Sequence, residues 1–263
     1  MVTAIDFNKK SLIIITGASQ GIGREIGCFV GKICKSGSKI ILIARSEGGL
    51  NESRNKIIDS NNDVVVTTYV RDLSKPDIED YKILIDEILN DGKSYDNAII
   101  FHNAGQVGAL VNAVKLNQLE TWRSYYDLNL FSVALLNSTF LERCKENIPN
   151  LYVINISSLC GHKPFADMAL YGSGKAARDL YFSVLAIEEP NINVLKYCPG
   201  PVDTAMFNEV IEKAQNIELK TQFTEMKNNE TVLTTKQTIG KLFEILESGK
   251  YKSGDLIDYF DRV

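Results

Sequence analysis

Short runs of apolar, mostly β-branched residues alternate with longer amphipathic segments along this chain. Unbroken apolar runs are typical of parallel strands that are covered on both faces of a sheet. The runs lie at residues 12–15, 40–43, 64–66, 98–101, 152–156 and 194–197. Their order predicts an α/β fold, a single-domain Rossmann-type doubly wound parallel sheet with helices on both faces.

The segments between the runs repeat apolar residues at helical spacing. Residues 77–89, 119–146 and 171–187 are the clearest of these segments. Residues 205–230 also have a helical pattern, but they are polar and only weakly apolar. Such a segment is either a mobile lid over a site or a plain surface helix, and the pattern does not choose between them. The length fits one domain spanning residues 1–263.

Composition and charge exclude several classes of protein. With 29 Lys and Arg against 33 Asp and Glu, the net charge is -4, and no basic stretch favours nucleic acid or a membrane surface. No apolar run approaches the roughly 18 residues that span a bilayer. Residues 1–10 lack the apolar core of a signal peptide, so we expect a cytoplasmic protein. Five Cys without a C-x-x-C pair and only two His predict neither a metal site nor a disulfide framework.

A glycine-rich loop follows the first strand and opens into a helix. Glycines at this position allow a tight turn and bring backbone N–H groups close to a pyrophosphate, whose charge the helix N-terminus stabilises. Three residues separate the first two glycines, which departs from the usual dinucleotide pattern, and a simple glycine turn is the alternative. The candidate cofactor-binding residues here are Gly17, Ala18, Ser19, Gln20, Gly21, Ile22 and Gly23.

Arg45 and Ser46 follow the second strand directly. Sites for NAD place an acidic residue near this point to bind the ribose 2′-hydroxyl, whereas an Arg pairs with the 2′-phosphate of NADP. We therefore predict NADP(H) as the cofactor, with a solvated Arg at a strand end as the alternative interpretation.

A Ser, a Tyr and a Lys in the second half of the chain have the spacing of a proton-transfer site. Ser158 follows the fifth strand, and Tyr171 and Lys175 are four residues apart, on one face of the next helix. A neighbouring ammonium brings the pKa of a Tyr toward the working range, and a Ser hydroxyl donates to a substrate carbonyl. Each residue alone also occurs for structural reasons, but their order after the glycine loop favours a catalytic site.

These motifs resemble the short-chain dehydrogenase/reductase family, and the resemblance covers essentially the whole chain. Further family motifs follow in order, namely Asp72-Leu73, Asn103-Ala104-Gly105, Asn129 and Pro199-Gly200. His102 replaces the first Asn of the family's Asn-Asn-Ala-Gly, and we expect little effect because Asn103 is retained.

The resemblance implies a role for each matched residue. Tyr171 would donate the proton, Lys175 would lower its pKa and hold the nicotinamide ribose, and Ser158 would polarise the carbonyl. Asn129 would kink its helix and anchor a water in a proton relay. The hydride chemistry belongs to the nicotinamide. Further cofactor contacts would come from Asp72 and Leu73 at the adenine, Asn103, Ala104 and Gly105 at the adenosine ribose, and Pro199, Pro201, Val202, Asp203, Thr204, Ala205 and Met206 at the nicotinamide end.

Within the family, the chain most resembles the sepiapterin reductases, which reduce side-chain ketones of pterins with NADPH in tetrahydrobiopterin biosynthesis. The resemblance lies in residues 155–160, 164–165, 169–171, 174–179, 185–190, 197–204, 252–254 and 257–261. It implies NADPH-dependent reduction of a pterin ketone by this chain. Gln20 stands where those enzymes carry Arg, so we expect NADPH to be preferred less steeply.

Asp258, in a C-terminal segment at 252–261 that we expect to anchor the substrate, would hold the pterin in this interpretation. A carboxylate brought to the pocket by a C-terminal strand can accept two hydrogen bonds, from the 2-amino group and a ring N–H of a pterin. An exposed acid near the chain end is the alternative, and Asp255 and Asp261 are close enough in sequence to hold the role instead. The other candidate substrate-binding residues, beside Ser158 and Tyr171, are Leu159, Phe165, Gly200 and Met206.

Two other functions remain open at this point. One is a broad-specificity carbonyl or diketone reductase of the same family. The other is a catalytically silent NADP(H)-binding sensor or scaffold, which the intact Ser158, Tyr171 and Lys175 disfavour. Family members usually pair through the long helix and the Tyr-Lys helix, and the apolar faces of 119–146 fit a homodimer.

Overall fold

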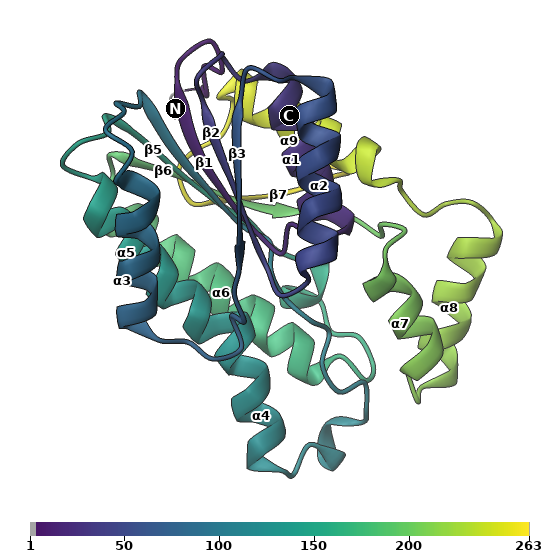
Figure 1. Ribbon diagram of the computed structural model, residues 1–263. Helices are drawn as coiled ribbons and strands as arrows, with labels where there is room; N and C mark the ends of the chain where they lie inside the picture. Colours follow the sequence, from purple (N-terminus) through teal and green to yellow (C-terminus); the bar gives the residue numbers. More distant parts are fainter. Residues whose placement is uncertain (1–3, 263) are drawn as a thin grey trace.

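In a computed structural model, which describes residues 4–262, seven parallel strands form one twisted sheet (Figure 1). Their order across the sheet is β3-β2-β1-β4-β5-β6-β7, which confirms the predicted fold class. Residues 1–3 and 263, which hold the expected ends of the domain, lie outside the described residues. The strands are β1 (Ser11–Thr16), β2 (Lys39–Ala44), β3 (Val65–Val70), β4 (Asn97–His102), β5 (Asn150–Ile156), β6 (Ile192–Cys198) and β7 (Asp255–Asp258).

Helices cover both faces of the sheet, and each face has its own apolar core. Because successive side chains of a strand point to opposite faces, Ile13 and Ile15 belong to one core while Leu12 and Ile14 belong to the other. The first face carries α1 (Gly21–Ile33), α2 (Glu47–Ser60) and α9 (Thr235–Ser248), and the second carries α3 (Ile78–Leu89), α5 (Ser132–Cys144) and α6 (Ala169–Glu188) (Figure 1).

The strand order reverses at β1, which pairs with β2 on one side and with β4 on the other. In open α/β sheets a crevice forms outside the carboxyl ends of the strands at such a point, and ligands bind there. The glycine loop follows β1, and the segments that begin at Asn103, Ser157 and Pro199 follow β4, β5 and β6. Most of the predicted site residues therefore lie together at the carboxyl ends of the strands.

The long helix expected over 119–146 is divided by a π turn. This turn, η2 (Asp127–Phe131), separates α4 (Leu119–Tyr126) from α5. Asn129 lies within it, and its side-chain amide donates to the carbonyl of Tyr125 at 2.9 Å. A π turn widens a helix by one residue and is frequent at functional sites. The distortion expected at Asn129 is therefore present, as a local widening of the helix.

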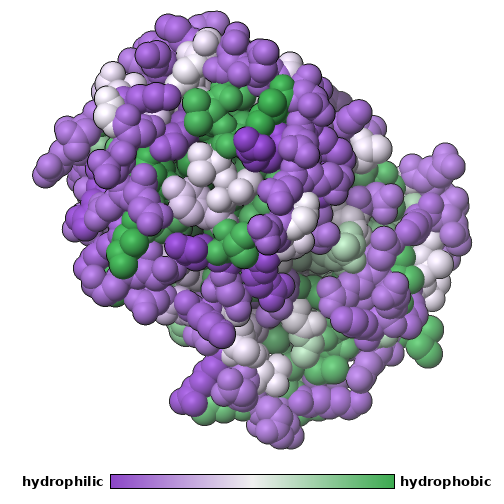
Figure 2. Space-filling view, viewed as in Figure 1, coloured by the Kyte–Doolittle hydropathy of each residue, from purple (hydrophilic) through white to green (hydrophobic). Residues whose placement is uncertain are grey.

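Two helices, α7 (Ala205–Lys213) and α8 (Ile217–Asn228), stand to one side of the sheet (Figure 1). They account for the polar helical pattern of residues 205–230. Most of the face in Figure 2 is hydrophilic, and a hollow with apolar side chains lies between these helices and the body of the sheet. Two short 3-10 turns, η1 (Ala113–Lys115) and η3 (Leu159–Gly161), lie in the loops nearby. Over residues 4–262, no helix is long and apolar enough to cross a membrane.

Candidate active site

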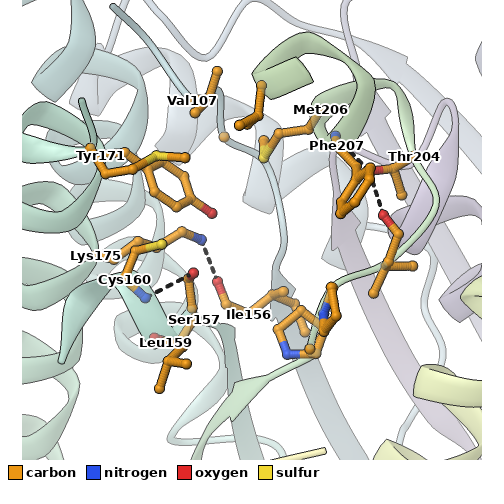
Figure 3. A pocket seen from close by; sticks show the side chains of 18 of the residues that line it. Val107, Ile156, Ser157, Leu159, Cys160, Tyr171, Lys175, Thr204, Met206 and Phe207 are labelled. Atoms are coloured by element: carbon orange, nitrogen blue, oxygen red, sulfur yellow. Dashed lines mark hydrogen bonds between the residues drawn. The ribbon is translucent and has the colours of Figure 1, made fainter. Parts of the chain in front are cut away.

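A cavity of about 270 Å³ opens at the carboxyl ends of β4, β5 and β6, and α7 and α8 close its far side. Figure 3 shows Tyr171 and Lys175 on one side of this cavity and Thr204, Met206 and Phe207 on the other. The structure thus brings together predicted residues that are far apart in the sequence. Those that line the cavity are Ile22, Asn103, Gly105, Ser158, Leu159, Phe165, Tyr171, Lys175, Pro199, Gly200, Pro201, Val202, Thr204, Met206 and Asp258.

The glycine loop is tied to the end of β4 by two polar side chains. The Thr16 hydroxyl donates to the carbonyl of Phe101 at 3.2 Å. The same hydroxyl accepts from the backbone N–H groups of Asn103 and Ala104, both at 3.0 Å. The Asn103 amide donates in turn to the carbonyls of Thr16 and Gly17, at 3.0 and 3.2 Å. Asn103 therefore holds the loop in place while it also lines the cavity.

Glycine is required at two positions of this loop. Gly17 has a φ of +67°, in the left-handed region that favours glycine. A Cβ at Gly23 would lie 2.3 Å from the carbonyl oxygen of Gly17, so any other residue would push α1 away from the loop. The side chain of Gln20 makes no capping bond to α1, which leaves the N–H groups at the start of this helix available to an anion.

Two residues that sequence reasoning missed, Arg24 of α1 and Ser53 of α2, hold the glycine loop against α2. The Ser53 hydroxyl donates to the carbonyl of Ala18 at 2.8 Å and accepts from Arg24 Nε at 3.0 Å. The Arg24 guanidinium also pairs with Glu52 at 2.6 Å. These contacts join helices that are about thirty residues apart in sequence, so no local pattern indicates them.

Tyr171 and Lys175 project from α6 into the cavity, as their four-residue spacing predicts. Lys175 Nζ lies 5.6 Å from the centre of the Tyr171 ring. The ammonium donates to the carbonyl of Ile156 at 2.7 Å (Figure 3). This bond fixes the Lys175 side chain against the end of β5, beside Ser158.

Burial governs the protonation of this pair. It raises the pKa of the Tyr171 phenol, and the Ser158 hydroxyl and the Arg178 guanidinium oppose that rise. Burial, with repulsion from Arg178, lowers the pKa of Lys175 to about 7, while Asp179 acts in the opposite direction. The expectation that Lys175 lowers the Tyr171 pKa stays a prediction. The groups that lower this pKa in the structure are the Ser158 hydroxyl and the Arg178 guanidinium, and burial removes part of the charge of Lys175 near neutral pH.

Ser158 and Asn129 are the other two residues predicted to be catalytic. The Ser158 hydroxyl accepts from the N–H of Cys160 at 3.2 Å, which leaves its own proton to be donated into the cavity. Asn129 is buried and does not line the cavity. Its amide oxygen accepts from the N–H of Gln106 at 3.0 Å, so it holds the loop that forms the cavity's edge.

Apart from Asn103 and Gly105, the predicted contacts for the adenosine half lie at neighbouring strand ends, outside the cavity. Arg45 and Gln20 are exposed. The Ser74 hydroxyl and, more weakly, Arg45 hold the pKa of the Asp72 carboxyl below its usual range, which places Arg45 near Asp72. Ser46 caps α2 by accepting from a backbone N–H at 3.2 Å. The other predicted residues that do not line the cavity are Gly17, Ala18, Ser19, Gly21, Gly23, Leu73, Ala104, Asp203 and Ala205.

Asp258 reaches the cavity from β7, where it is the register partner of Cys198 in β6. One of its carboxylate oxygens accepts from the N–H of Phe260 at 3.0 Å. Its own N–H donates to Asp261 at 2.8 Å. Asp255 and Asp261 do not line the cavity, so of these three acids Asp258 alone faces it.

Sequence reasoning also missed most of the far side of the cavity. Phe207 and Val210 of α7 and Phe223 and Met226 of α8 line it, and each pair is spaced three residues apart on one helix face. The rings of Phe207 and Phe223 lie 4.9 Å apart. The apolar spacing within 205–230 was the signal that could have identified them. The remaining unpredicted lining residues are Gln106, Val107, Ile156, Ser157, Cys160, Met168, Gln222 and Phe260.

The chain is similar to several known proteins over most of its length. A family model described as short chain dehydrogenase matches residues 11–215. The chain is 30% identical to the sepiapterin reductase of Rattus norvegicus over 254 residues, covering 95% of this chain and 97% of that protein. It is 26% identical to the benzil reductase ((S)-benzoin forming) of Bacillus cereus, covering 93% of this chain and 97% of that protein. The solved structure of the KRED1-Pglu enzyme matches with a TM-score of 0.78 at 25% identity, over 94% of this chain and 100% of that chain.

Proposed function

Because this chain belongs to the short-chain dehydrogenase family of oxidoreductases, we propose that it is an NADPH-dependent reductase of pterin side-chain ketones. One observation carries the proposal: Tyr171, Lys175, Ser158 and Asp258 all line a single, largely apolar cavity. The intact Tyr-Lys pair at the cavity disfavours a silent sensor or scaffold, which has no need of a proton donor there. NADPH consumption by the purified protein separates these two functions.

The crevice has features that fit NADP(H). The start of α1 has unused N–H groups for a pyrophosphate, and Gly17 and Gly21, both with positive φ, leave its approach free of side chains. The exposed Arg45 would meet the 2′-phosphate, and Gln20 would add a hydrogen bond without charge. The bound nicotinamide supplies the hydride, and the residues of the chain bind it, orient it and exclude water.

The proton would come from Tyr171. Because burial raises the pKa of its phenol, Tyr171 holds its proton at neutral pH and can act as an acid toward a carbonyl oxygen. The Ser158 hydroxyl would donate to the same oxygen and stabilise the charge that develops there. Lys175, with a pKa near 7, would return a proton to the phenolate. Each end of the Asn129 amide already makes one bond, which leaves one donor and one acceptor for a relay water.

Asp258 would select the pterin. Among residues 4–262 its side chain accepts one hydrogen bond, from the N–H of Phe260, and this leaves acceptor positions for the 2-amino group and ring N–H of a pterin. Leu159, Phe165 and Met206 would flank the flat ring, and Gly200 adds no side chain to the wall between them.

The experiment is NADPH oxidation by the purified protein with sepiapterin as the substrate. The Asp258→Ala variant should raise KM by about 10²-fold, because it removes two charge-assisted hydrogen bonds, while kcat changes less. Asp255→Ala is the matched control, since Asp255 lies on the same strand but does not line the cavity. An unchanged KM in Asp258→Ala would contradict the proposed role of Asp258 in binding the pterin. Equal values of kcat/KM with NADH and with NADPH would contradict the NADPH preference that we assign to Arg45.

A broad-specificity diketone reductase is the second candidate, and the lining of the cavity favours it. Met168, Met206 and Met226 all line the cavity, and the flexible thioethers of methionine adapt to ligands of different shape. The relative from Bacillus cereus named for benzil reduction is consistent with this candidate. The ratio of kcat/KM for sepiapterin to kcat/KM for an aromatic diketone decides between the two.

We also propose a homodimer formed through α5 and α6. Leu180, Val184 and Ile187 form an apolar stripe on the outer face of α6, with exposed fractions of 67%, 42% and 80%. Phe131, at the end of η2 and immediately before α5, is exposed as well. Such stripes are usually covered by a partner. A monomer in sedimentation at micromolar concentration would contradict this proposal.

A further inference from the structure

Two charged residues follow Lys175 within one turn of α6, and both are buried. Arg178 is fully enclosed and Asp179 is 3% exposed. A buried charge is costly unless it is paired and hydrogen-bonded, so a deep pair beside the active site needs a physical reason. The pKa of Arg178 is lowered by burial to about 10, so the guanidinium stays charged at neutral pH.

Asn155 of β5 connects the two charges. Its amide oxygen accepts from Arg178 Nε at 3.0 Å. Its amide nitrogen donates to the Asp179 carboxylate at 2.9 Å. Because an amide has one acceptor end and one donor end, the two charged groups fix the orientation of the Asn155 side chain. Its two hydrogen bonds then link the guanidinium to the carboxylate.

Arg178 also holds the end of β4. Its guanidinium donates to the carbonyl of His102 at 2.7 Å and to the carbonyl of Ala104 at 3.2 Å. These two carbonyls lie on either side of Asn103, which holds the glycine loop and lines the cavity. One side chain therefore fixes the cofactor-facing loop relative to the helix that carries Tyr171.

Asp179 holds the end of β5 in the same way. Its carboxylate accepts from the hydroxyl of Ser157, which directly precedes Ser158. It also accepts from His162 Nε2 at 2.8 Å, just beyond the turn η3. The ends of β4 and β5 are thus both fixed to two consecutive residues of α6, the helix that carries Tyr171 and Lys175.

The two charges act on the Tyr171–Lys175 pair with opposite signs. The positive charge of Arg178 favours deprotonation of both Tyr171 and Lys175, so it lowers the pKa of each. The negative charge of Asp179 favours the protonated form of Lys175, so it raises the pKa of Lys175. The other ionisable groups that face Lys175 are the thiols of Cys160, in η3, and Cys198, at the end of β6, which are neutral at neutral pH because burial raises their pKa.

We propose that Arg178 and Asp179 are positioning residues of the reaction, a buried pair of opposite charge that fixes Tyr171 and Lys175 against the ends of β4 and β5 and balances the electric field on them. The proposal rests on the proposed function only in assigning proton transfer to Tyr171 and Lys175. The identity of the ketone does not enter it.

The test compares Arg178→Met and Asp179→Asn by two measurements. The first is competitive acylation of the Lys175 amine in the cofactor-free protein over a series of pH values, measured by peptide mass spectrometry. The second is the alkaline limb of kcat against pH, with whichever ketone the wild-type protein reduces. Asp91→Asn is the matched control, because it breaks another ion pair to a buried Lys, Lys39 at 2.9 Å. Lys39 is the first residue of β2, at the amino ends of the strands and away from the cavity.

We expect the two variants to shift both midpoints in opposite directions. Asp179→Asn should lower them by about one pH unit, because Lys175 loses its counter-charge, and Arg178→Met should raise them by about one pH unit. Asp91→Asn should leave them unchanged. Shifts in the same direction, or no shift in folded variants, would overturn the proposal. Since the acylation midpoint needs no ketone, a wrong substrate assignment cannot produce either result.

Two further variants decide the matter if a single neutralised charge prevents folding. Arg178→Lys keeps the charge but cannot bond Asn155, His102 and Ala104 together, so the midpoints should stay while kcat falls by about 10²-fold. The double variant Arg178→Met with Asp179→Asn leaves no unpaired charge, and its midpoints should return to the wild-type values. A wild-type kcat in Arg178→Lys, or a shift of about one unit in the double variant, would refute the proposal.

Discussion

The two sides of the cavity are held by different forces. On one side, which we call the polar wall, α6 and the ends of β4 and β5 are joined by bonds between buried groups, chiefly Arg178, Asp179 and Asn155. On the other side, the apolar wall, α7 and α8 are held by an apolar cluster. Its buried members are Val107, Leu110, Met168, Val210, Ala214 and Leu219.

This difference assigns the two walls different tasks. Hydrogen bonds to charged groups are directional and fix atoms closely, as the proposed proton transfer from Tyr171 to a carbonyl requires. Apolar contacts are non-directional, so α7 and α8 can adjust to substrates of different shape. The comparison implies that changes in the polar wall alter kcat and the response to pH, whereas changes in the apolar wall alter KM and selectivity.

Replacing Tyr171 by Phe tests the polar wall at the reacting atom and should have the largest effect. Removing the proton donor should lower kcat by about 10²–10⁴-fold, with KM nearly unchanged. The matched control is Tyr126→Phe, on α4 and away from the cavity, which should keep full activity. Steady-state NADPH oxidation provides the measurement, and a loss of less than about tenfold would exclude Tyr171 as the donor.

Replacing His102 by Asn tests how acid affects the polar wall. Burial, followed by repulsion from Arg178, lowers the pKa of His102 to about 3, so His102 stays neutral in the fold. The unfolded chain binds a proton below about pH 6.5, and stability is therefore lost as pH falls from 6.5 toward 3. Between about pH 7.5 and about pH 5, the wild type should lose about 2 kcal/mol more than His102→Asn. Urea unfolding at both pH values measures this difference, and parallel losses would contradict it.

Replacing Asp167 should loosen the apolar wall and have a smaller effect. Asp167 has a φ of +59°, and its buried carboxylate accepts from the N–H of Asn216, in the turn between α7 and α8. Asp167→Ala removes this bond and should raise KM about fivefold with little change in kcat. Asp167→Gly also removes the backbone strain, so it should be the more stable of the two by about 1 kcal/mol. A fall in kcat by as large a factor as the rise in KM would show that Asp167 acts on the polar wall instead.

Replacing Lys115 by Ala should have the smallest effect. Its ammonium donates to Gln215 at 3.0 Å, in the same turn, but both side chains are solvent-exposed. Exposed pairs contribute little, so stability should change by less than about 0.5 kcal/mol and KM by less than about twofold. Thermal unfolding and steady-state kinetics check both values. A larger rise in KM than that of Asp167→Ala would mean that the exposed bond between Lys115 and Gln215 holds the turn between α7 and α8.

Local features of this protein were predictable from the sequence, and long-range ones were not. The strands, the glycine loop and the four-residue spacing of Tyr171 and Lys175 depend on neighbouring residues, and the structure agrees with all three. The partners of Arg178 lie 23 to 76 residues away, so its role needs the fold. Burial also sets the direction of the pKa shifts of Tyr171 and Lys175, and burial cannot be read from the spacing of residues.

The apolar cluster that holds α7 and α8 makes the enzyme respond to temperature unevenly. Apolar contacts weaken on cooling because burying apolar surface lowers the heat capacity, whereas hydrogen bonds between charged groups do not depend on this effect. In the cold, the contacts of Val210 and Leu219 with the rest of the cluster should therefore loosen first. The selectivity of the site would decline on cooling before its chemistry does.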